Sequence, residues 1–432
     1  MMRRTFGLMV VCASGTLTLL FLSSIPHFSL VSGAAAQQQQ ARQTPPATSA
    51  ETRMTIHLLR APERTIQDTY SSFSAVAVDV ARNEIVLEDE NRDQIMMYGR
   101  LDNTPAQATM SEPKRVIGGS HTKISQNCGL YVDPLTGDVY SVNADTTNYM
   151  TVWSRQASGN VAANRELVTP HRAFGVVIDE EAKELFMTIE HPPAVVVFPK
   201  TARENDAPLR ILEGDKTQLA EVHGVALDTK NQLLYVANQG PTSRNSNDVG
   251  WARDVEPGKP TVEWTPDSDR WMYLVPGSGE FRPPSITVYP LKASGDTPPL
   301  RVIQGPLTRL DWPAHLSLDV EHGELFVANS VTDEILVFRA SDNGNVAPIR
   351  VLKGPHTGLG HPHGVFVDTK NDELVVANFG NHSSTVYRRN ASGDTPPLRT
   401  VRAAPASAPA PMFGSIGALA YDTKRDQILA PN

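Results

Sequence analysis

Cysteine is almost missing from this 432-residue sequence. Cys12 lies in an apolar run near the N-terminus, and Cys128 is the only other one. A chain processed after that run would keep a single cysteine and could form no internal disulfide. We therefore expect burial of a hydrophobic core alone to stabilise the fold, even in an oxidising compartment.

An excess of basic residues is also missing. The chain has 39 Lys and Arg against 47 Asp and Glu, a net charge of −8, and removal of Arg3 and Arg4 with a leader would make it −10. An acidic chain without a basic stripe is a poor partner for nucleic acid. Short motifs of enzymes and cofactor sites are absent too: there is no G-x-S-x-G, H-E-x-x-H, P-loop, EF-hand loop or C-x-x-C.

The N-terminus predicts export. Arg3 and Arg4 precede an uncharged, mostly apolar run from 6 to 22, and Ala34-Ala35-Ala36 offers a cleavage site. Residues 1–36 are therefore predicted to be a signal peptide of a periplasmic or secreted protein; an uncleaved membrane anchor is the alternative. Residues 37–53 form a polar, patternless linker that we expect to be disordered, and no later segment is long and apolar enough to span a membrane.

A repeat runs through the rest of the chain. An apolar strand ending in Asp is followed by a short turn, a second strand that usually ends in Asn, an aliphatic-aromatic strand and an Arg-containing strand. The segments 223–240 (HGVALDTKNQLLYVANQG) and 363–380 (HGVFVDTKNDELVVANFG) show it best. The Asp recurs seven times, at Asp79, Asp133, Asp179, Asp228, Asp319, Asp368 and Asp422.

Four short strands in about 50 residues are typical of one blade of a β-propeller. Residues 54–432 are thus predicted to form an all-β, seven-bladed propeller, and we expect it to be monomeric. The last repeat stops after two strands, and 54–66 resembles the two that are missing. We expect these N- and C-terminal segments to complete one shared blade that closes the ring.

Several repeat positions have an evident structural use. The Asp residues sit where a tight turn begins and can accept hydrogen bonds from its backbone. The threonines Thr122, Thr217, Thr308 and Thr357 recur before inner strands, as turn caps do. The asparagines that end the second strands, among them Asn238, Asn329 and Asn378, could cap a loop or face a ligand or metal in the central channel.

The pattern resembles the NHL and YVTN repeat families and the seven-bladed lactonase-like propellers. The VAN-x-G and SITVY elements and the stretch PHGV-x-VD at 362–368 carry this resemblance. It implies a propeller fold and leaves function open, because such repeats serve enzymes, binding proteins and scaffolds.

Histidine gathers on one predicted face. Strand directions alternate, so loops between strands two and three, and between strand four and the next strand one, share what we call the upper face. Most histidines after the leader map there. His223 and His363 open inner strands beside the channel, and His315 occupies a position where other repeats mostly have Gly. Glu190 and Asp89, near the ends of their second strands, could contribute carboxylates.

The fourth repeat is interrupted. Asp228 and Asp319 are 91 residues apart, whereas the other spacings are 46 to 54. The insert, 239–284, falls in an upper loop and contains Trp251, Trp264 and Trp271, while Trp312 lies in the next upper loop. An aromatic insert of this length is typical of a lid or a binding loop, or of a flap that covers a blade.

Three functions stay open. The first is a non-enzymatic protein that binds a small molecule or a protein partner on its upper face. The second is a lactonase-like or related metal-assisted hydrolase or lyase, with a divalent metal (Zn, Cu or Ca) held by His223, His315 and His363. The third is a structural component of a cell-envelope assembly. The candidate ligand-binding residues are His223, His315, His363, Asn238, Asn329, Asn378, Trp251, Trp264, Trp271 and Trp312.

Overall fold

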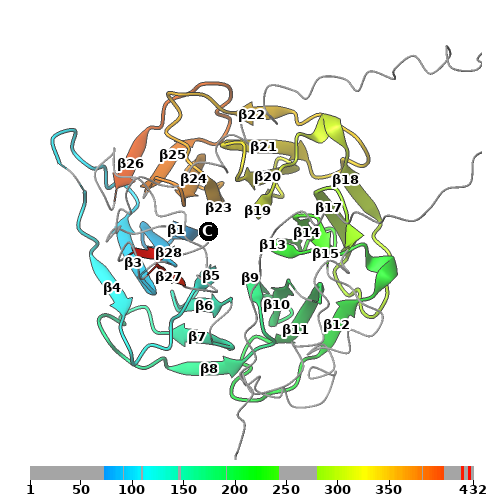
Figure 1. The fold of residues 1–432 in the computed structure, drawn as a ribbon, viewed down its shortest axis with the longest axis horizontal. Helices are drawn as coiled ribbons and strands as arrows, with labels where there is room; N and C mark the ends of the chain where they lie inside the picture. The colour runs from blue at the N-terminus through cyan, green and yellow to red at the C-terminus, as the bar shows by residue number, and fades with distance from the viewer. Residues whose placement is uncertain are drawn as a thin grey trace, which may run out of the picture. The chain divides into compact units, whose positions relative to one another are not determined.

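The structure is a computed structural model, and the residues it describes are 73–90, 92–108, 110–144, 147–190, 192–242, 280–381, 383–402, 420–422 and 427–429. They contain six four-stranded antiparallel sheets, each built from one stretch of chain. Figure 1 shows these sheets as blades around a central axis, in chain order. The β-propeller expected from the repeat is therefore present.

The first three blades precede the insert and the last three follow or contain it. Blades one to three are β1(Phe73–Asp79), β2(Glu84–Asp89), β3(Gln94–Gly99), β4(Arg115–Gly118); β5(Asn127–Val132), β6(Val139–Asn143), β7(Tyr149–Trp153), β8(Arg165–Val168); and β9(Ala173–Asp179), β10(Glu184–Ile189), β11(Ala194–Pro199), β12(Arg210–Glu213). Blades four to six are β13(Val222–Asp228), β14(Leu233–Asn238), β17(Ser285–Pro290), β18(Arg301–Gln304); β19(Pro313–Asp319), β20(Glu324–Asn329), β21(Glu334–Arg339), β22(Arg350–Leu352); and β23(Pro362–Asp368), β24(Glu373–Asn378), β25(Ser383–Arg388), β26(Arg399–Arg402).

The blade count corrects the prediction of seven. Each inner strand contacts the next around the ring, and β23 of blade six contacts β1 of blade one directly. Six hydrophobic clusters fill the six junctions, including one that joins Val375 and Val386 of blade six to Ile85 and Leu87 of blade one. Six blades thus close a ring among the described residues.

The seventh Asp belongs to a smaller element. Asp422 ends β27(Ala420–Asp422), which pairs only with β28(Gln427–Leu429) in a two-stranded sheet. The segment 54–66, predicted to share its blade, lies outside the described residues. The last repeat contributes two strands, as predicted. Among the described residues they pair only with each other and do not complete a seventh blade, because two strands of a repeat can form a hairpin alone.

Blades six and one are joined at their outer edges by backbone hydrogen bonds. The amide of Thr104 donates to the carbonyl of Thr400 at 2.8 Å, and that of Ser111 donates to the carbonyl of Arg402 at 2.9 Å. Further in, the carboxylate of Glu373 binds Arg399 of its own blade at 2.7 Å and Arg100 of blade one at 2.6 Å. This seam closes the ring without a shared blade.

The repeated Asp and Thr residues have the predicted structural roles. Asp228 and Asp368 accept hydrogen bonds from turn amides three residues later, at 2.8 and 3.0 Å. Thr217 and Thr308 each donate to the carbonyl of a glycine three residues earlier, both at 2.6 Å. These side chains hold the turns in shape and are not available for chemistry.

The predicted signal peptide and linker lie outside the described residues, so export remains a prediction. Within the described part of the chain, no helix has the length and apolar character needed to cross a membrane.

A carboxyl group is buried between blades one and two. Glu88, on β2, is fully buried, and neither of its carboxyl oxygens has a hydrogen-bond partner among the described residues. Ser141 and Asn127 of blade two face it and favour its charged form, but no well-aligned hydrogen bond joins them to it. Burial dominates and raises the pKa of Glu88 to about 8, so the group is a neutral acid at pH 7.

Glu88→Gln should change how stability depends on pH. A raised carboxyl pKa means that the folded chain holds a proton above pH 4.5 that the unfolded chain releases, so stability falls as pH rises toward 8. For this group alone the wild type should lose on the order of 3 kcal/mol between pH 5 and pH 8. The neutral amide removes this loss. Urea unfolding at both pH values checks it, and parallel pH profiles for the two proteins would refute it.

Glu373→Gln should weaken the seam of the ring. The substitution removes the charge that holds two arginines from different blades, and a lost charged partner typically costs about 1–3 kcal/mol. Glu84→Gln is the matched control, because among the described residues Glu84 pairs with Arg115 alone, within blade one, at 2.7 Å. We expect the larger drop in urea midpoint for Glu373→Gln; an equal or smaller drop would contradict the assignment of the seam.

Candidate functional site

A β-bulge in every blade aims side chains at the upper end of the channel. The pairing of each inner strand with its neighbour is interrupted five residues before the repeated Asp. Such irregularities redirect side chains and are frequent beside functional sites. The residues in these six bulges include Ser74, Cys128, Phe174, His223, Ala314, His315 and His363.

Four rings from four blades meet there, and we call Phe174, His223, His315 and His363 the ring cluster. The Phe174 ring centroid lies 3.7 Å from that of His223, 5.6 Å from that of His315 and 5.7 Å from that of His363. His363 is 5.6 Å from His315 and 6.5 Å from His223. The three histidines predicted to converge on the channel do so.

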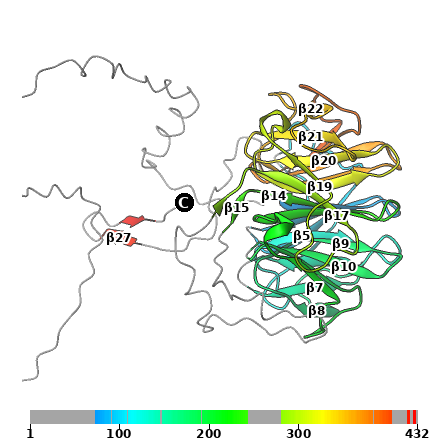
Figure 2. The same cartoon turned by 90° about the vertical axis from the view of Figure 1, so that its right-hand side faces the viewer.

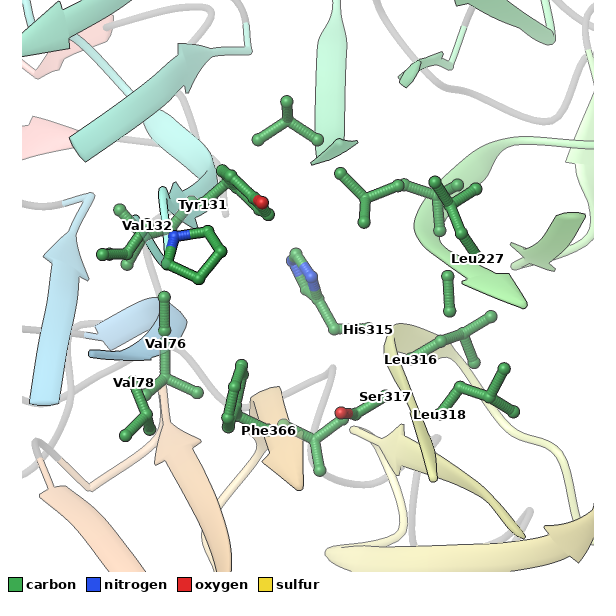
Figure 3. Close-up of a pocket in the computed structure, with 18 of the residues that line it drawn as sticks. Val76, Val78, Tyr131, Val132, Leu227, His315, Leu316, Ser317, Leu318 and Phe366 are labelled. Atoms are coloured by element: carbon green, nitrogen blue, oxygen red, sulfur yellow. The ribbon is translucent and has the colours of Figure 1, made fainter. Parts of the chain in front are cut away.

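His315 occupies a repeat position where most blades have Gly, and the neighbouring inner strand leaves little room for a side chain there. A Cβ on Gly129 would lie 2.0 Å from the carbonyl oxygen of Phe174, and one on Gly175 would lie 2.5 Å from that of His223. The inner strands approach so closely that most blades tolerate only Gly here. Blade five carries His315 instead, and its ring lies in the channel (Figure 3).

His223 is held from two sides. The amide nitrogen of Gln239 lies 2.9 Å from Nδ1, and the Glu190 carboxylate lies 2.9 Å from Nε2. An amide nitrogen only donates, so Nδ1 accepts and the proton sits on Nε2, toward Glu190. The contact between Nε2 and the Glu190 carboxylate is short but lacks the alignment of a hydrogen bond. Arg172 lies 3.3 Å from the same carboxylate.

More acids surround this group. Glu90 bonds the buried thiol of Cys128 and lies near Glu190. Loss of water around the carboxyl raises the pKa of Glu90 to about 7, although part of its surface is still exposed, and Glu190 adds to the effect. Burial likewise raises the pKa of Glu221, opposed by His223. We call Glu90, Glu190, Glu221, His223 and Gln239 the upper site.

Sequence reasoning missed most of the upper site. Glu90 and Gln239 were not singled out, although they share one repeat position, directly after the residue that ends strand two. The chain is varied at that position: Glu90, Ala144, Glu190, Gln239, Ser330 and Phe379. The signal in the sequence was variation beside a position that is mostly Asn. It does not show where these side chains point, because that depends on the bulges in the neighbouring strands.

A third repeat position frames the upper mouth. The residue seven before each Asp adopts a left-handed backbone, with φ between 42° and 58° in the five described cases, and none of them is Gly. Non-glycine residues in this region carry strain that often accompanies function. These residues are Gln126, Arg172, Glu221, Trp312 and His361.

The lower part of the channel is a separate cavity of 540 Å³. All six inner strands line it with mostly apolar residues, among them Val76, Leu227 and Phe366, and the ring of His315 lies in the middle of them (Figure 3). It extends to the exposed Pro134 and Lys370 in the turns between strands one and two. The described residues thus place an open cavity on the face opposite the predicted binding face.

The three histidines do not form a metal site in this arrangement. Among the described residues, no group of three His, Cys, Asp or Glu side chains is placed to hold one ion. Burial lowers the pKa of His363 to about 4 and that of His315 well below its usual range, so both rings are neutral at pH 7. Nδ1 of His363 is bonded to the carbonyl of Ser74 at 2.7 Å. We therefore derive no chemistry from a metal.

The asparagines predicted as possible ligands serve as loop caps. Asn238 accepts from the amide of Ala220 at 3.0 Å, and Asn329 accepts from that of Asp311 at 2.7 Å. Asn378 donates to Thr385 at 3.0 Å. All three are fully buried, with their amides bonded to their own blades, and they offer no free group to a ligand in the channel.

The other candidates are scattered or lie outside the described residues. Trp251, Trp264 and Trp271 are outside them. At the base of the insert, β15(Pro241–Thr242) pairs with β16(Glu280–Phe281), and Figure 2 shows β15 at one face of the ring. Trp312 is 44% exposed. Asp89 is buried and bonded to a turn amide, that of Arg92, at 2.9 Å.

Comparison with known proteins adds a family resemblance over part of the chain. Residues 254–413 match the profile of the family described as Lactonase, 7-bladed beta-propeller. That stretch is less than half of the chain and includes His315 and His363, but it begins after Glu90, Glu190 and His223. No curated protein matches the sequence. Among solved structures, Kuenenia stuttgartiensis Hydrazine Synthase is similar at 11% identity, with 76% of this chain and 99% of that chain covered and a TM-score of 0.47.

Proposed function

We propose that the protein is an exported β-propeller that binds a small molecule rich in hydrogen-bond donors at the upper site. The observation that carries this proposal is the convergence of Glu90, Glu190, His223 and Gln239 on one end of the channel. They come from repeat positions whose side chains vary from blade to blade, while the neighbouring Asp and Asn positions stay nearly constant. Diversity confined to positions that face a channel is expected of recognition.

The chemistry of the ligand follows from the groups that face it. Three carboxyls, from Glu90, Glu190 and Glu221, make the site rich in acceptors. Phe174 and Phe379 add aromatic surface beside the histidines. Hydroxyl groups of a sugar or sugar lactone, or an ammonium group, satisfy such a set, whereas an anionic ligand would be repelled.

Glu190→Gln should weaken binding of such ligands. We expect thermal-shift and calorimetric screens of monosaccharides, aldonolactones and small amines to find a ligand for the wild type. The amide should cost at least about tenfold in affinity, since a charged hydrogen bond is worth roughly 1.5–3 kcal/mol. Glu181→Gln, in an exposed turn of the same blade, is the control. No ligand in any class, or equal binding by Glu190→Gln, would overturn the proposal.

A second candidate function is hydrolysis of a lactone or ester. Its observation is the pairing of Glu90, whose pKa burial raises to about 7, with Glu190, which lies beside Arg172 and His223. Two neighbouring carboxyls in different protonation states can divide acid and base roles. Glu190 would accept a proton from the attacking water, and Glu90 would protonate the alkoxide that leaves the carbonyl carbon. The partial lactonase resemblance agrees with this reaction.

If the protein is a hydrolase, its rate should fall as pH rises through about 7, because Glu90 must carry a proton to act as the acid. An aldonolactone panel assayed from pH 5 to 9 measures this profile. Glu90→Gln, which cannot donate, should be about 100-fold slower and lack the alkaline limb. Unchanged rates in Glu90→Gln would exclude this mechanism while leaving binding at the upper site intact.

A further inference from the structure

We propose that the ligand of the upper site is a small primary amine, whose ammonium group is held by the carboxyls of Glu90, Glu190 and Glu221. This inference rests on the function proposed above and narrows its ligand to one chemical class. Two features carry it: the carboxyls of the site outnumber the bases that contact them, and the hydrogen-bond donors of the site already contact its own members.

Only one of the three carboxyls has a basic partner. Glu190 lies 2.9 Å from Nε2 of His223 and 3.3 Å from Arg172. Among the described residues, no basic side chain lies within ion-pair distance of Glu90 or Glu221. Both side chains are partly exposed, so a ligand can reach them. Carboxyls that are partly buried and lack a basic partner favour a ligand that brings a cation.

Glu90 is surrounded by other acids. The charges that act on it most strongly are those of Glu190 in blade three and of Asp93 and Asp89 in its own blade, and all of them are negative. The thiol of Cys128 in blade two donates a hydrogen bond to it. Burial, with these acids, raises the pKa of Glu90 to about 7. An ammonium group beside Glu90 stabilises its ionised form, so binding of an amine displaces a proton from this carboxyl.

Glu221 completes the set from another blade. It directly precedes β13, the strand that carries His223. Burial raises the pKa of Glu221 and the charge of Glu190 adds to this effect, while His223 and Arg172 oppose it. Glu190 therefore acts on both of the other carboxyls. A single cation next to Glu190 relieves the repulsion on each side of it.

Hydrogen-bond chemistry separates an amine from a sugar. A carboxylate only accepts and an ammonium group only donates, whereas a hydroxyl group does both. Nε2 of Gln239 lies 2.9 Å from Nδ1 of His223. Nε2 of His223 and the guanidinium of Arg172 both lie against the Glu190 carboxylate. The oxygen of a bound hydroxyl would compete with these contacts for a donor, but an ammonium group needs none.

Two matched pairs of probes test the inference by calorimetry on the full-length protein: cyclohexylamine against cyclohexanol, and 1,4-diaminobutane against 1,4-butanediol. Within each pair only the ammonium and hydroxyl groups differ. We expect an amine to bind at least about tenfold more tightly than its alcohol, because it adds charged hydrogen bonds. Both amines stay protonated below about pH 9. The affinity for the amine should rise about tenfold from pH 6 to pH 8, since Glu90 becomes ionised over that range.

Three variants locate the interaction. Glu90→Gln cannot release a proton, so it should remove most of the rise in affinity with pH. Glu221→Gln should weaken amine binding at every pH, and Glu181→Gln, in an exposed turn, should change neither property. Amines that bind no more tightly than the alcohols, or a pH dependence that Glu90→Gln retains, would overturn the inference.

The sugar arms of the ligand screen separate this inference from the proposed function. If a monosaccharide or aldonolactone binds, Glu190→Gln weakens that binding and no amine binds, the inference is wrong and the proposed function stands. If no probe of any class binds, both are wrong.

Discussion

The close approach of the six inner strands around the axis governs the rest of this structure. At the glycine position the backbone of one blade lies so near the next that a Cβ would stand 2.0 Å from a carbonyl at Gly129 and 2.8 Å from an amide at Gly364. The second of these contacts joins blade six to blade one. Because the same approach recurs at that junction, the ring is complete with six blades, and a seventh has no place between β23 and β1 among the described residues.

That approach also creates the site. Strands packed this tightly cannot continue regular pairing to their ends, and each yields a bulge that turns a side chain toward the axis. In blades three, four and six these side chains are Phe174, His223 and His363. His315, the one large side chain at the position that is mostly Gly, reaches the same place from blade five. The resulting ring cluster separates a polar, acid-rich upper site from an apolar lower cavity, so the two ends of the channel differ in the ligands they favour.

The sequence allowed the blade, the turn chemistry and the convergence of three histidines to be predicted, because each depends on contacts inside one repeat or on its order around an axis. The blade count could not be predicted in this way. Asp422 ends β27 just as the other six Asp residues end their inner strands, yet among the described residues β27 pairs only with β28. Glu90 and Gln239 were missed for a related reason. Their neighbours in the site come from bulges on other strands, and a bulge is a register irregularity that the periodicity of a strand does not reveal.

The contacts of the histidines explain why the cluster suits recognition better than metal binding. Nδ1 of His363 is hydrogen-bonded to the carbonyl of Ser74. Nδ1 of His223 is hydrogen-bonded to Gln239, and its Nε2 lies against the carboxylate of Glu190. A metal would have to displace these partners and gather three rings whose centroids are up to 6.5 Å apart. The ring of His315 lines the apolar cavity, and burial lowers the pKa of this histidine. The carboxyls of the upper site favour hydrogen-bond donors on a polar ligand, whereas the lining of the lower cavity is mostly apolar. The chemistry of the channel therefore divides at His315.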